Sequence, residues 1–298
     1  MDLKIIDVNF FTTEAVASYL IETGEGPMLI ETGPDTSFEN LKSGLSDLGY
    51  APSDVKHVFV THIHLDHSGA AWHFAEAGST IYVHPVGAPH LVDPEKLMRS
   101  ATRIYGEDNM RRLWGEVRGM DKDRVVAIED GQVINIGDVE VKIIETAGHA
   151  GHHHCYLIEN ALFTGDTAGC LMAGGPMIPA TPPPEIHLEK WNASIEKMRE
   201  ISPDILYLTH FGGYTDVGPM LDDAAEKLEE WSEWIGERVS AGKSDEEITE
   251  EFGDYFRGIF EREGVSEEVY QKYDLMTPYH MNAGGLIRYW KKYMLPGS

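Results

Sequence analysis

Residues 61–69 read Thr61-His62-Ile63-His64-Leu65-Asp66-His67-Ser68-Gly69. The apolar residues 55–60 before them are typical of a strand, and Gly69 opens a short helical pattern, so we predict a loop between the two. His62 and His64 lie two positions apart and can point the same way from an extended segment. Asp66 and His67 follow the bend and can point to a neighbouring position. Imidazole and carboxylate groups suit zinc, and also iron or manganese, so the loop predicts ligands for two metal ions.

Three later strands are also predicted to end near a residue that can bind a metal. Each of these residues follows an apolar run and a threonine: His149 after 139–145, Asp166 after 161–164, and His210 after 204–209. Alone, His149 or His210 would be interpreted as an ordinary structural histidine. Because four strands end in the same pattern, we expect these three residues to supply the remaining ligands.

Strand and helix patterns alternate along the first two thirds of the chain. Apolar runs typical of strands lie at 3–10, 16–22, 27–32, 55–60, 79–83, 125–128, 132–136, 139–145, 154–158, 161–164 and 204–209. Helical patterns lie at 35–48, where Asp35 is the expected N-cap, and at 69–77 and 185–200. Strands, helix, strands and helix in two successive halves predict an α/β sandwich with sheets inside and helices outside.

Two regions depart from this alternation. Residues 86–120 contain Met98, Tyr105, Met110 and Trp114 and favour a helical insertion, which could cover the metals as a lid, pack in the core or serve a homodimer. From residue 219 the chain is acidic and helical in pattern, with helices expected near 219–240, 245–263 and 266–273 and after Gly285. We therefore predict a catalytic domain over 1–218 and an acidic helical C-terminal appendage over 219–298.

The charge of the chain excludes several partners. Its 298 residues carry 50 acidic and 24 basic side chains, a formal net charge of −26, which repels nucleic acid and anionic membranes. No apolar run approaches the ~20 residues needed to cross a bilayer. Two cysteines, Cys155 and Cys170, cannot form a disulfide framework, so we expect a cytoplasmic protein that acts on a small-molecule substrate.

The ligand-type residues follow the order of a known family. The metallo-β-lactamase-fold hydrolases carry a His-x-His-x-Asp-His loop, a later Gly-His, an Asp after a strand and a final His, and residues 1–215 of this chain resemble them. The resemblance implies a four-layered αβ/βα sandwich with a two-metal site at one sheet edge. It assigns His62, His64 and His149 to metal one, Asp66, His67 and His210 to metal two, and Asp166 to a bridging position. The lactonase and glyoxalase II branch is the most similar.

Some positions depart from the family pattern. The usual Thr-Pro-Gly-His-Thr stretch reads Thr-Ala-Gly-His-Ala over 146–150, which should alter loop stiffness more than metal binding. True β-lactamases of this fold often use a Cys ligand or lack the second Asp-His pair, so the intact Asp66-His67 disfavours antibiotic hydrolysis. Di-iron electron-transfer relatives commonly carry Glu where this chain has His64. We interpret Cys170 as a small buried residue rather than a ligand.

The resemblance implies a reaction class. Two cations about 3.5 Å apart can share a water and lower its pKa, which provides a bridging hydroxide near neutral pH. We therefore predict a di-metal hydrolase, with zinc favoured, of small ester, lactone, thioester or phosphoester substrates, and favour a lactonase- or phosphotriesterase-like activity. Asp66 could also relay a proton. Tyr214, by positional analogy with lactonases, could donate to a carbonyl oxygen, and Tyr279 or His280 could reach the pocket from 276–285.

Other functions compete with this prediction. A mononuclear iron persulfide dioxygenase would need only part of the ligand set, whereas Asp66, His67 and His210 favour two metals. A hydroxyacylglutathione-type thioesterase usually has a basic helical tail, but residues 219–298 are acidic. A nuclease is opposed by the net charge, and a non-catalytic metal-binding protein would not need a complete ligand set. His152 could contact the metal ligands or the substrate.

Overall fold

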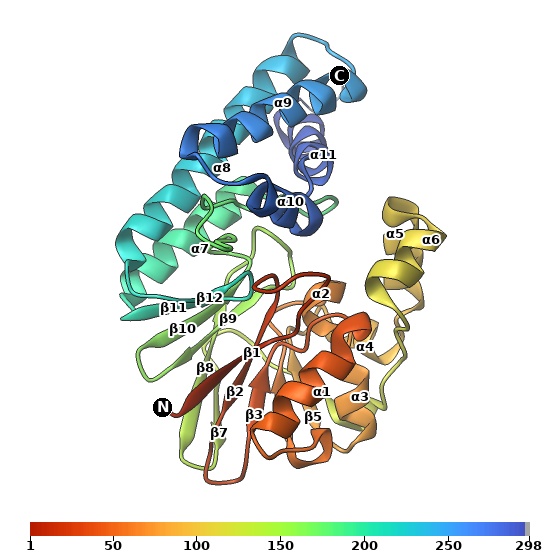
Figure 1. Ribbon diagram of the computed structural model, residues 1–298, viewed down its shortest axis with the longest axis vertical. Coiled ribbons are helices and arrows are strands. Elements are labelled where there is room, and N and C mark those ends of the chain that lie inside the picture. The colour runs from red at the N-terminus through yellow and green to blue at the C-terminus, as the bar shows by residue number, and fades with distance from the viewer. Residues whose placement is uncertain (296–298) are drawn as a thin grey trace. The chain divides into compact units, whose positions relative to one another are not determined.

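The structure is a computed structural model that describes residues 1–295. Two compact units make up the chain (Figure 1). The N-terminal unit comprises Met1–Glu145 and His152–Gly165, and the C-terminal unit comprises Thr146–Gly151 and the residues from Asp166 onward. The candidate ligands are divided between these units, because His62, His64, Asp66 and His67 belong to the first and His149, Asp166 and His210 to the second. The predicted boundary between residues 218 and 219 remains a prediction.

The first sheet of the N-terminal unit holds the loop that carries four candidate ligands. Its strands lie in the order β1 (Leu3–Asp7), β2 (Ala17–Ile21), β3 (Met28–Ile30), β4 (His57–Phe59), β5 (Thr80–Val83) and β6 (Val125–Ala127). β1 to β3 pair antiparallel, and β3 to β6 pair in parallel. β2 and β3 are buried along their whole length, which explains their unbroken apolar sequences. Helices α1 (Phe38–Asp47) and α3 (Ala71–Glu76) connect the parallel strands and cover the outer face (Figure 1).

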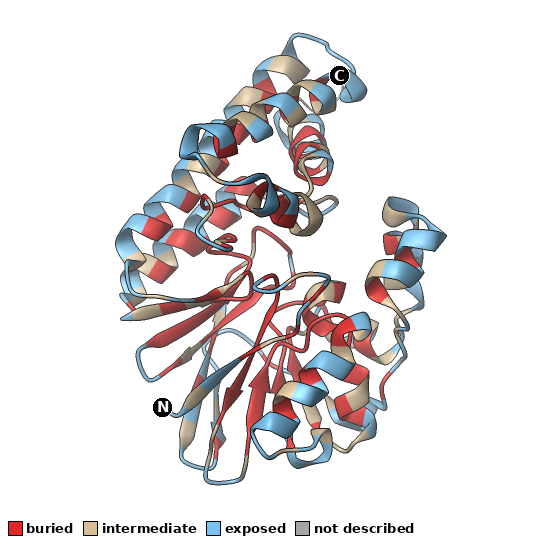
Figure 2. Cartoon of the chain, in the orientation of Figure 1, coloured by how far each residue is buried: buried red, intermediate tan, exposed pale blue. Residues whose placement is uncertain are grey.

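A second set of strands in this unit packs against the first sheet. β7 (Val133–Ile136), β8 (Val139–Glu145), β9 (His154–Ile158) and β10 (Ala161–Gly165) are each antiparallel to the next. Phe163 meets Tyr19 edge to face with ring centroids 5.2 Å apart, and Tyr156 meets Phe59 at 5.3 Å. The Tyr156 hydroxyl donates to the Val60 carbonyl at 2.6 Å. This buried layer, red in Figure 2, fixes the end of β4 and therefore the start of the ligand-bearing loop.

The C-terminal unit is mainly helical. It contains α7 (Leu188–Ile201), the antiparallel pair β11 (Ile205–Leu208) and β12 (Gly212–Tyr214), then α8 (Val217–Ser240), α9 (Asp245–Glu263), α10 (Glu267–Met276), α11 (Tyr279–Tyr289) and a π-helical turn at Trp290–Met294. The short β12 has no counterpart in the sequence prediction. Trp231 of α8 packs against Phe252 and Phe256 of α9, with ring centroids 5.3 and 5.7 Å apart. Aromatic packing thus holds the long helices together.

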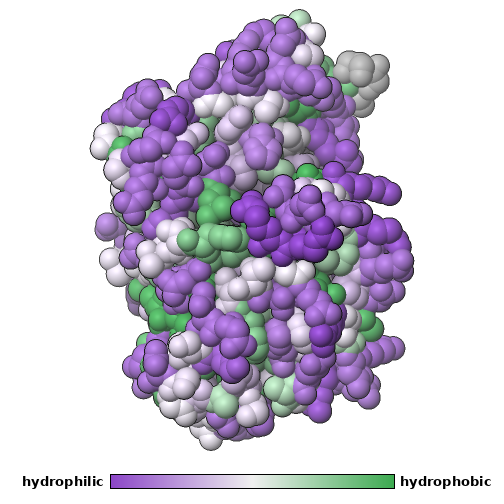
Figure 3. All heavy atoms as spheres, turned by 45° about the vertical axis from the view of Figure 1, so that its right-hand side comes forward, coloured by the Kyte–Doolittle hydropathy of each residue, from purple (hydrophilic) through white to green (hydrophobic). Residues whose placement is uncertain are grey.

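The surface of the protein is largely hydrophilic. Hydrophilic side chains predominate on the face shown in Figure 3, with apolar atoms visible only in smaller patches between them. Within residues 1–295, no helix combines the length and the apolar character that a membrane span requires.

Residues 86–120 contain several short helices. They form α4 (Ala88–Val92), α5 (Glu95–Tyr105), α6 (Glu107–Asn109) and a π-helical turn at Met110–Trp114. The Trp114 ring stacks on Phe10 at 5.6 Å and meets Tyr105 at 5.3 Å, which attaches this insertion to the N-terminal unit. Asp35 is not the helix cap that we expected, because its carboxylate accepts the Glu116 N–H at 2.8 Å. The lid function of the insertion remains a prediction.

The last helix begins earlier than predicted. α11 starts at Tyr279 rather than after Gly285, and Gly285 lies within the helix at a site of close packing. A Cβ atom on Gly285 would lie 1.9 Å from the Thr181 carbonyl oxygen. On the same helix, the Asn282 side chain accepts the Thr181 N–H at 2.8 Å and donates to the Thr277 carbonyl at 2.9 Å. These contacts bind α11 closely to the segment around residue 181.

The glycine pair of α11 provides a test of this packing. We expect Gly285→Ala to lower the free energy of unfolding by about 1–3 kcal/mol, because the backbone oxygen that it meets has little room to move. Gly284→Ala is the matched control, since its Cβ would meet only Pro183 at 3.9 Å and should raise the free energy of unfolding by about 0.5–1 kcal/mol. Chemical denaturation measures both changes, and two equal effects would contradict the packing argument.

Candidate metal centre

The loop after β4 brings its four candidate ligands together in two pairs. The chain is extended through His64, and helix α2 (Leu65–Ser68) begins directly after it. Ligand atoms of His62 and His64 lie within 4.8 Å of each other, and the same holds for Asp66 and His67. His62 and His67 are fully buried, whereas His64 and Asp66 are half-buried. The pairing that the sequence spacing predicts is therefore present within the N-terminal unit.

A buried glutamate orients two of these histidines. Glu31 follows β3, and its Oε1 lies 3.1 Å from His67 Nδ1. The Thr61 hydroxyl donates to the same Glu31 oxygen and lies 3.0 Å from His62 Nδ1. With Nδ1 engaged in this way, Nε2 is the nitrogen of each ring that suits a metal. The sequence analysis missed Glu31, although it follows an apolar strand just as the predicted ligands do.

The C-terminal unit presents one carboxylate between two imidazoles. Asp166 Oδ2 lies 3.3 Å from His149 Nε2, and Asp166 Oδ1 lies 3.4 Å from His210 Nε2. All three side chains are buried. His149 Nδ1 lies 2.8 Å from the Ala180 carbonyl oxygen, which again leaves Nε2 as the nitrogen directed at the carboxylate. Each oxygen of Asp166 thus serves a different histidine, an arrangement suited to a residue shared by two cations.

Gly148 is needed for the position of His149. Its φ is +148°, and a Cβ atom there would lie 2.3 Å from the Trp191 Cα atom. Trp191 in turn donates from its indole nitrogen to the Thr167 carbonyl at 2.7 Å. Helix α7 therefore contacts the backbone of Gly148, which precedes His149, and of Thr167, which follows Asp166.

The structure places Cys170 beside two of the candidate ligands. Its sulfur, Asp166 and His210 each offer a ligand atom, and all of these atoms lie within 4.8 Å of one another. Cys170 is buried, as expected, but its surroundings are those of a metal-binding group rather than of an apolar core alone.

The two other predicted catalytic residues differ in their surroundings. The Tyr214 hydroxyl donates to the Leu171 carbonyl at 2.7 Å, and the Leu171 N–H donates to the His210 carbonyl at 2.6 Å, so Tyr214 is tied to the segment beside His210. His280 is exposed at the start of α11, with its ring 5.7 Å from that of Tyr279. Catalytic roles for Tyr214 and His280 remain predictions.

His152 lies in the N-terminal unit close to the ligand loop. Its ring centroid is 6.1 Å from that of His62 and 5.8 Å from that of His64. His153 is nearer to His62, at 4.9 Å. The histidines that follow His149 in sequence thus surround the first ligand pair rather than pointing to solvent, and His152 is only 6% exposed.

Tyr105 of the insertion is influenced by the charge of Asp66. Burial, with a smaller contribution from the Asp66 carboxylate, raises the pKa of the Tyr105 hydroxyl above its usual value. The hydroxyl is therefore neutral at physiological pH. The insertion therefore contributes a neutral phenol group, and the charge of Asp66 is close enough to affect the pKa of that group.

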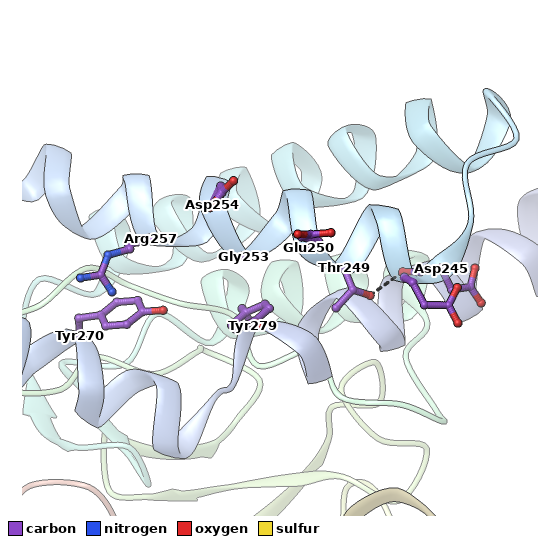
Figure 4. Close-up of a pocket in the computed structure, with 9 residues that line it drawn as sticks. Asp245, Thr249, Glu250, Gly253, Asp254, Arg257, Tyr270 and Tyr279 are labelled. Carbon is purple, nitrogen blue, oxygen red and sulfur yellow. Dashed lines mark hydrogen bonds between the residues drawn. The ribbon is translucent and has the colours of Figure 1, made fainter.

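The C-terminal unit contains a cavity whose lining residues differ from the predicted metal ligands. It has a volume of about 660 Å³ and is lined by Asp245, Glu246, Thr249, Glu250, Gly253, Asp254, Arg257, Tyr270 and Tyr279 (Figure 4). The side chains come from α9, α10 and the first turn of α11. None of the seven predicted ligands lines it, and a role for Tyr279 at the candidate metal centre remains a prediction.

The donor set fits divalent metal ions. It consists of imidazole nitrogens and carboxylate oxygens, the groups that bind zinc, iron or manganese in proteins. Three of the histidines have Nδ1 next to a fixed oxygen, from Thr61, Glu31 or Ala180. Such contacts set the ring orientation that metal binding requires.

Comparison with known proteins identifies the family. The family model of the metallo-beta-lactamase superfamily matches residues 11–210, about two thirds of the chain. The chain therefore belongs to the metallo-β-lactamase superfamily, and the predicted sandwich of two sheets flanked by helices, with further helices at the C-terminus, is confirmed. Members of this superfamily are typically metal-dependent hydrolases, and the fold typically binds two metal ions.

Individual relatives agree with this assignment. The metallo-beta-lactamase fold-containing protein ST1585 of Sulfurisphaera tokodaii is 28% identical over 203 residues, which cover 66% of this chain and 73% of the relative. Its crystal structure has a TM-score of 0.63 at 25% identity and covers 76% of this chain and 85% of its own. TTHA1429 of Thermus thermophilus shares the fold, with a TM-score of 0.74 at 17% identity over 97% of this chain and 93% of its own.

One relative has a named activity. The atrochrysone carboxyl ACP thioesterase of Aspergillus fumigatus is 26% identical over 222 residues, or 74% of this chain. The chain spans only 43% of the length of that fungal protein. The similarity thus relates the shared region to a hydrolase of thioesters without covering the whole of that enzyme.

Proposed function

We propose that the protein is a di-metal hydrolase of small ester-type substrates, with lactones and phosphotriesters favoured. One metal would be held by His62, His64 and His149, the other by Asp66, His67 and His210, and Asp166 would be shared by both. The observation that carries the proposal is the position of Asp166, which offers a separate oxygen to each of two buried histidines. The orientation of His62 and His67 by Thr61 and Glu31 supports it, as does membership of the family.

When bound, two divalent cations would lower the pKa of a water and would offset negative charge that develops on the substrate. The side chains of the protein supply the proton acceptor and hold the metal ligands in position. Asp66 is half-buried, which suits a carboxylate that both binds a metal and accepts a proton from water. Thr61 and Glu31 hold the histidine rings in position, and Tyr105 of the insertion adds a neutral hydroxyl within the electrostatic range of Asp66.

The thioester substrates are a second candidate class. The named thioesterase among the relatives favours them. A glutathione thioester is disfavoured, because the formal net charge of −26 on the chain repels a substrate with two carboxylates. Zinc is the proposed metal for either class, because histidine nitrogens and carboxylate oxygens are its usual ligands in hydrolytic sites.

A substrate panel combined with metal analysis tests the proposal. The protein is reconstituted separately with zinc, manganese or iron, and its hydrolysis of lactones, thioesters and phosphotriesters is measured together with bound metal per chain. We expect two metals per chain and hydrolysis of a lactone or a phosphotriester at least about tenfold faster than that of any thioester, a difference of about 1.4 kcal/mol in the barrier. The reverse ratio would favour the thioesterase. A single bound iron with oxygen consumption on persulfides would contradict the hydrolase proposal and favour the dioxygenase.

A further inference from the structure

The geometry points to Cys170 as an additional metal ligand, which forms with Asp166 and His210 a set of one sulfur, one oxygen and one nitrogen ligand. This inference rests on the proposed function, since it concerns the metal shared by Asp166 and His210. It adds a thiolate to a centre that otherwise holds only imidazoles and carboxylates.

The distances are compatible with coordination. Zinc lies about 2.3 Å from a cysteine sulfur and about 2.0–2.2 Å from nitrogen or oxygen ligands, so neighbouring ligand atoms of one ion are roughly 3–4 Å apart. His210 Nε2 and Asp166 Oδ1 lie 3.4 Å apart, within this range. The ligand atoms of Cys170, Asp166 and His210 all lie within 4.8 Å of one another, so a side-chain shift of about 1 Å or less completes the set.

The backbone fixes Cys170 at this position. The Gly169 N–H donates to the Asp166 carbonyl at 3.0 Å, and Gly169 has a φ of +85°, so a tight turn returns the chain towards Asp166. Cys170 then pairs with Ile178 through two backbone hydrogen bonds of 2.8 and 2.9 Å. The next residue, Leu171, donates to the His210 carbonyl at 2.6 Å.

A side chain of helix α10 fixes the segment that follows Cys170. The Tyr273 hydroxyl of α10 accepts the Met172 N–H at 2.7 Å and donates to the Pro176 carbonyl at 2.7 Å. Together with the Tyr214 contact to Leu171, this leaves the backbone around Cys170 little freedom to move. A rigid frame of this kind lowers the entropic cost of binding a metal.

A sulfur ligand changes which metal the site prefers. Thiolates favour zinc and related borderline or soft cations, whereas manganese and magnesium prefer oxygen ligands. Coordination forms a bond between sulfur and the metal and releases the thiol proton to solvent, with no change of oxidation state. Cys170 therefore selects zinc over manganese at the ion that Asp166 and His210 share.

Cobalt substitution tests the inference without relying on activity. The full-length protein is stripped of metal and titrated with Co²⁺ alone, while bound cobalt is quantified. We expect a sulfur-to-cobalt charge-transfer band in the near ultraviolet for the wild type, and its loss in Cys170→Ser. Cys155→Ser is the matched control: Cys155 is equally buried but lies on β9, where its sulfur is 3.5 Å from the Thr164 carbonyl, so the band should remain.

A competition experiment adds a second measurement. We expect Cys170→Ser to reduce the ratio of zinc to manganese affinity by at least about tenfold, in the range seen when a group that tunes a metal site is removed. Cobalt bound without a charge-transfer band in the wild type would overturn the Cys170 assignment and leave the di-metal proposal intact. Failure to bind cobalt at all would overturn both. If Cys170→Ser does not fold, the Cys155→Ser spectrum decides the question, because Cys170 is then the remaining thiol.

Discussion

Asp166→Asn is expected to remove hydrolysis and metal together. The substitution keeps the shape of the side chain but takes away the negative charge that lies 3.3 Å from His149 Nε2 and 3.4 Å from His210 Nε2. An amide also offers only one oxygen, so it cannot serve both histidines. We expect turnover to fall by at least about a hundredfold, since removing one preorganised electrostatic contact costs about 10²–10³ in rate. Bound metal, measured by elemental analysis, should fall from two per chain to one or fewer.

The control for this prediction is Asp204→Asn. Asp204 is an exposed aspartate that precedes β11, so the same change of charge and atoms should leave turnover and metal content unchanged. If Asp166→Asn retained two metals and turnover while only the KM rose, Asp166 would act on the substrate and not as the bridge.

Glu31→Gln is expected to weaken metal binding although Glu31 is not itself a proposed ligand. One carboxylate oxygen accepts from the Thr61 hydroxyl and lies 3.1 Å from His67 Nδ1. Glutamine carries no charge, and one of its two terminal atoms is a donor, so it is a weaker acceptor for both groups. Loss of such an orienting contact typically lowers metal affinity by about 10–100-fold. Competition with a chelator measures the affinity.

The same substitution should also lower the stability of the protein. Glu31 is fully buried, and leaving a buried donor unsatisfied costs about 1–3 kcal/mol. Glu159→Gln is a matched control, because both glutamates have a positive φ, +53° at Glu159 and +66° at Glu31. Glu159, however, lies on the surface, where it pairs with the N-terminal amine. An equal effect of both variants on zinc affinity would show that Glu31 does not orient the ligands.

The pairing of ligands within each unit could be predicted from the sequence, because it follows from local geometry. Two histidines separated by one residue in an extended segment point the same way, and the first turn of a helix redirects the next two ligands. The positions of His149, Asp166 and His210 were predictable for a related reason. Each follows an apolar strand, and β8 and β10 run in the same direction on either side of β9, so both end at the same edge of the sheet.

Glu31 comes directly after the apolar strand β3, as the predicted ligands follow their own strands. Its sequence context, Glu-Thr-Gly, suits a simple turn equally well, so the pattern alone does not single it out. Its role depends on the parallel pairing of β3 with β4, which brings residue 31 beside the loop that follows β4. That pairing joins residues about 30 positions apart and has no local sequence signal.

The environment of Cys170 and the start of α11 were not predictable for a different reason. Cys170 gains its neighbours through a turn at Gly169 and a bridge to Ile178, both of which depend on tertiary packing. Gly285 of α11 permits a close helix contact whose partner, Thr181, lies about a hundred residues earlier in the chain. Sequence periodicity describes the face of a helix and does not identify what it touches.

The contact between α11 and the segment at residue 181 has a practical consequence for anyone seeking a minimal catalytic fragment. The Ala180 carbonyl, which orients His149, is followed directly by Thr181, whose N–H and hydroxyl both bond to Asn282 of the last long helix. Truncation after residue 218 would remove this support and expose the apolar surface that the helix covers. The terminal helices are therefore a structural part of the protein, and any shortened version should retain them.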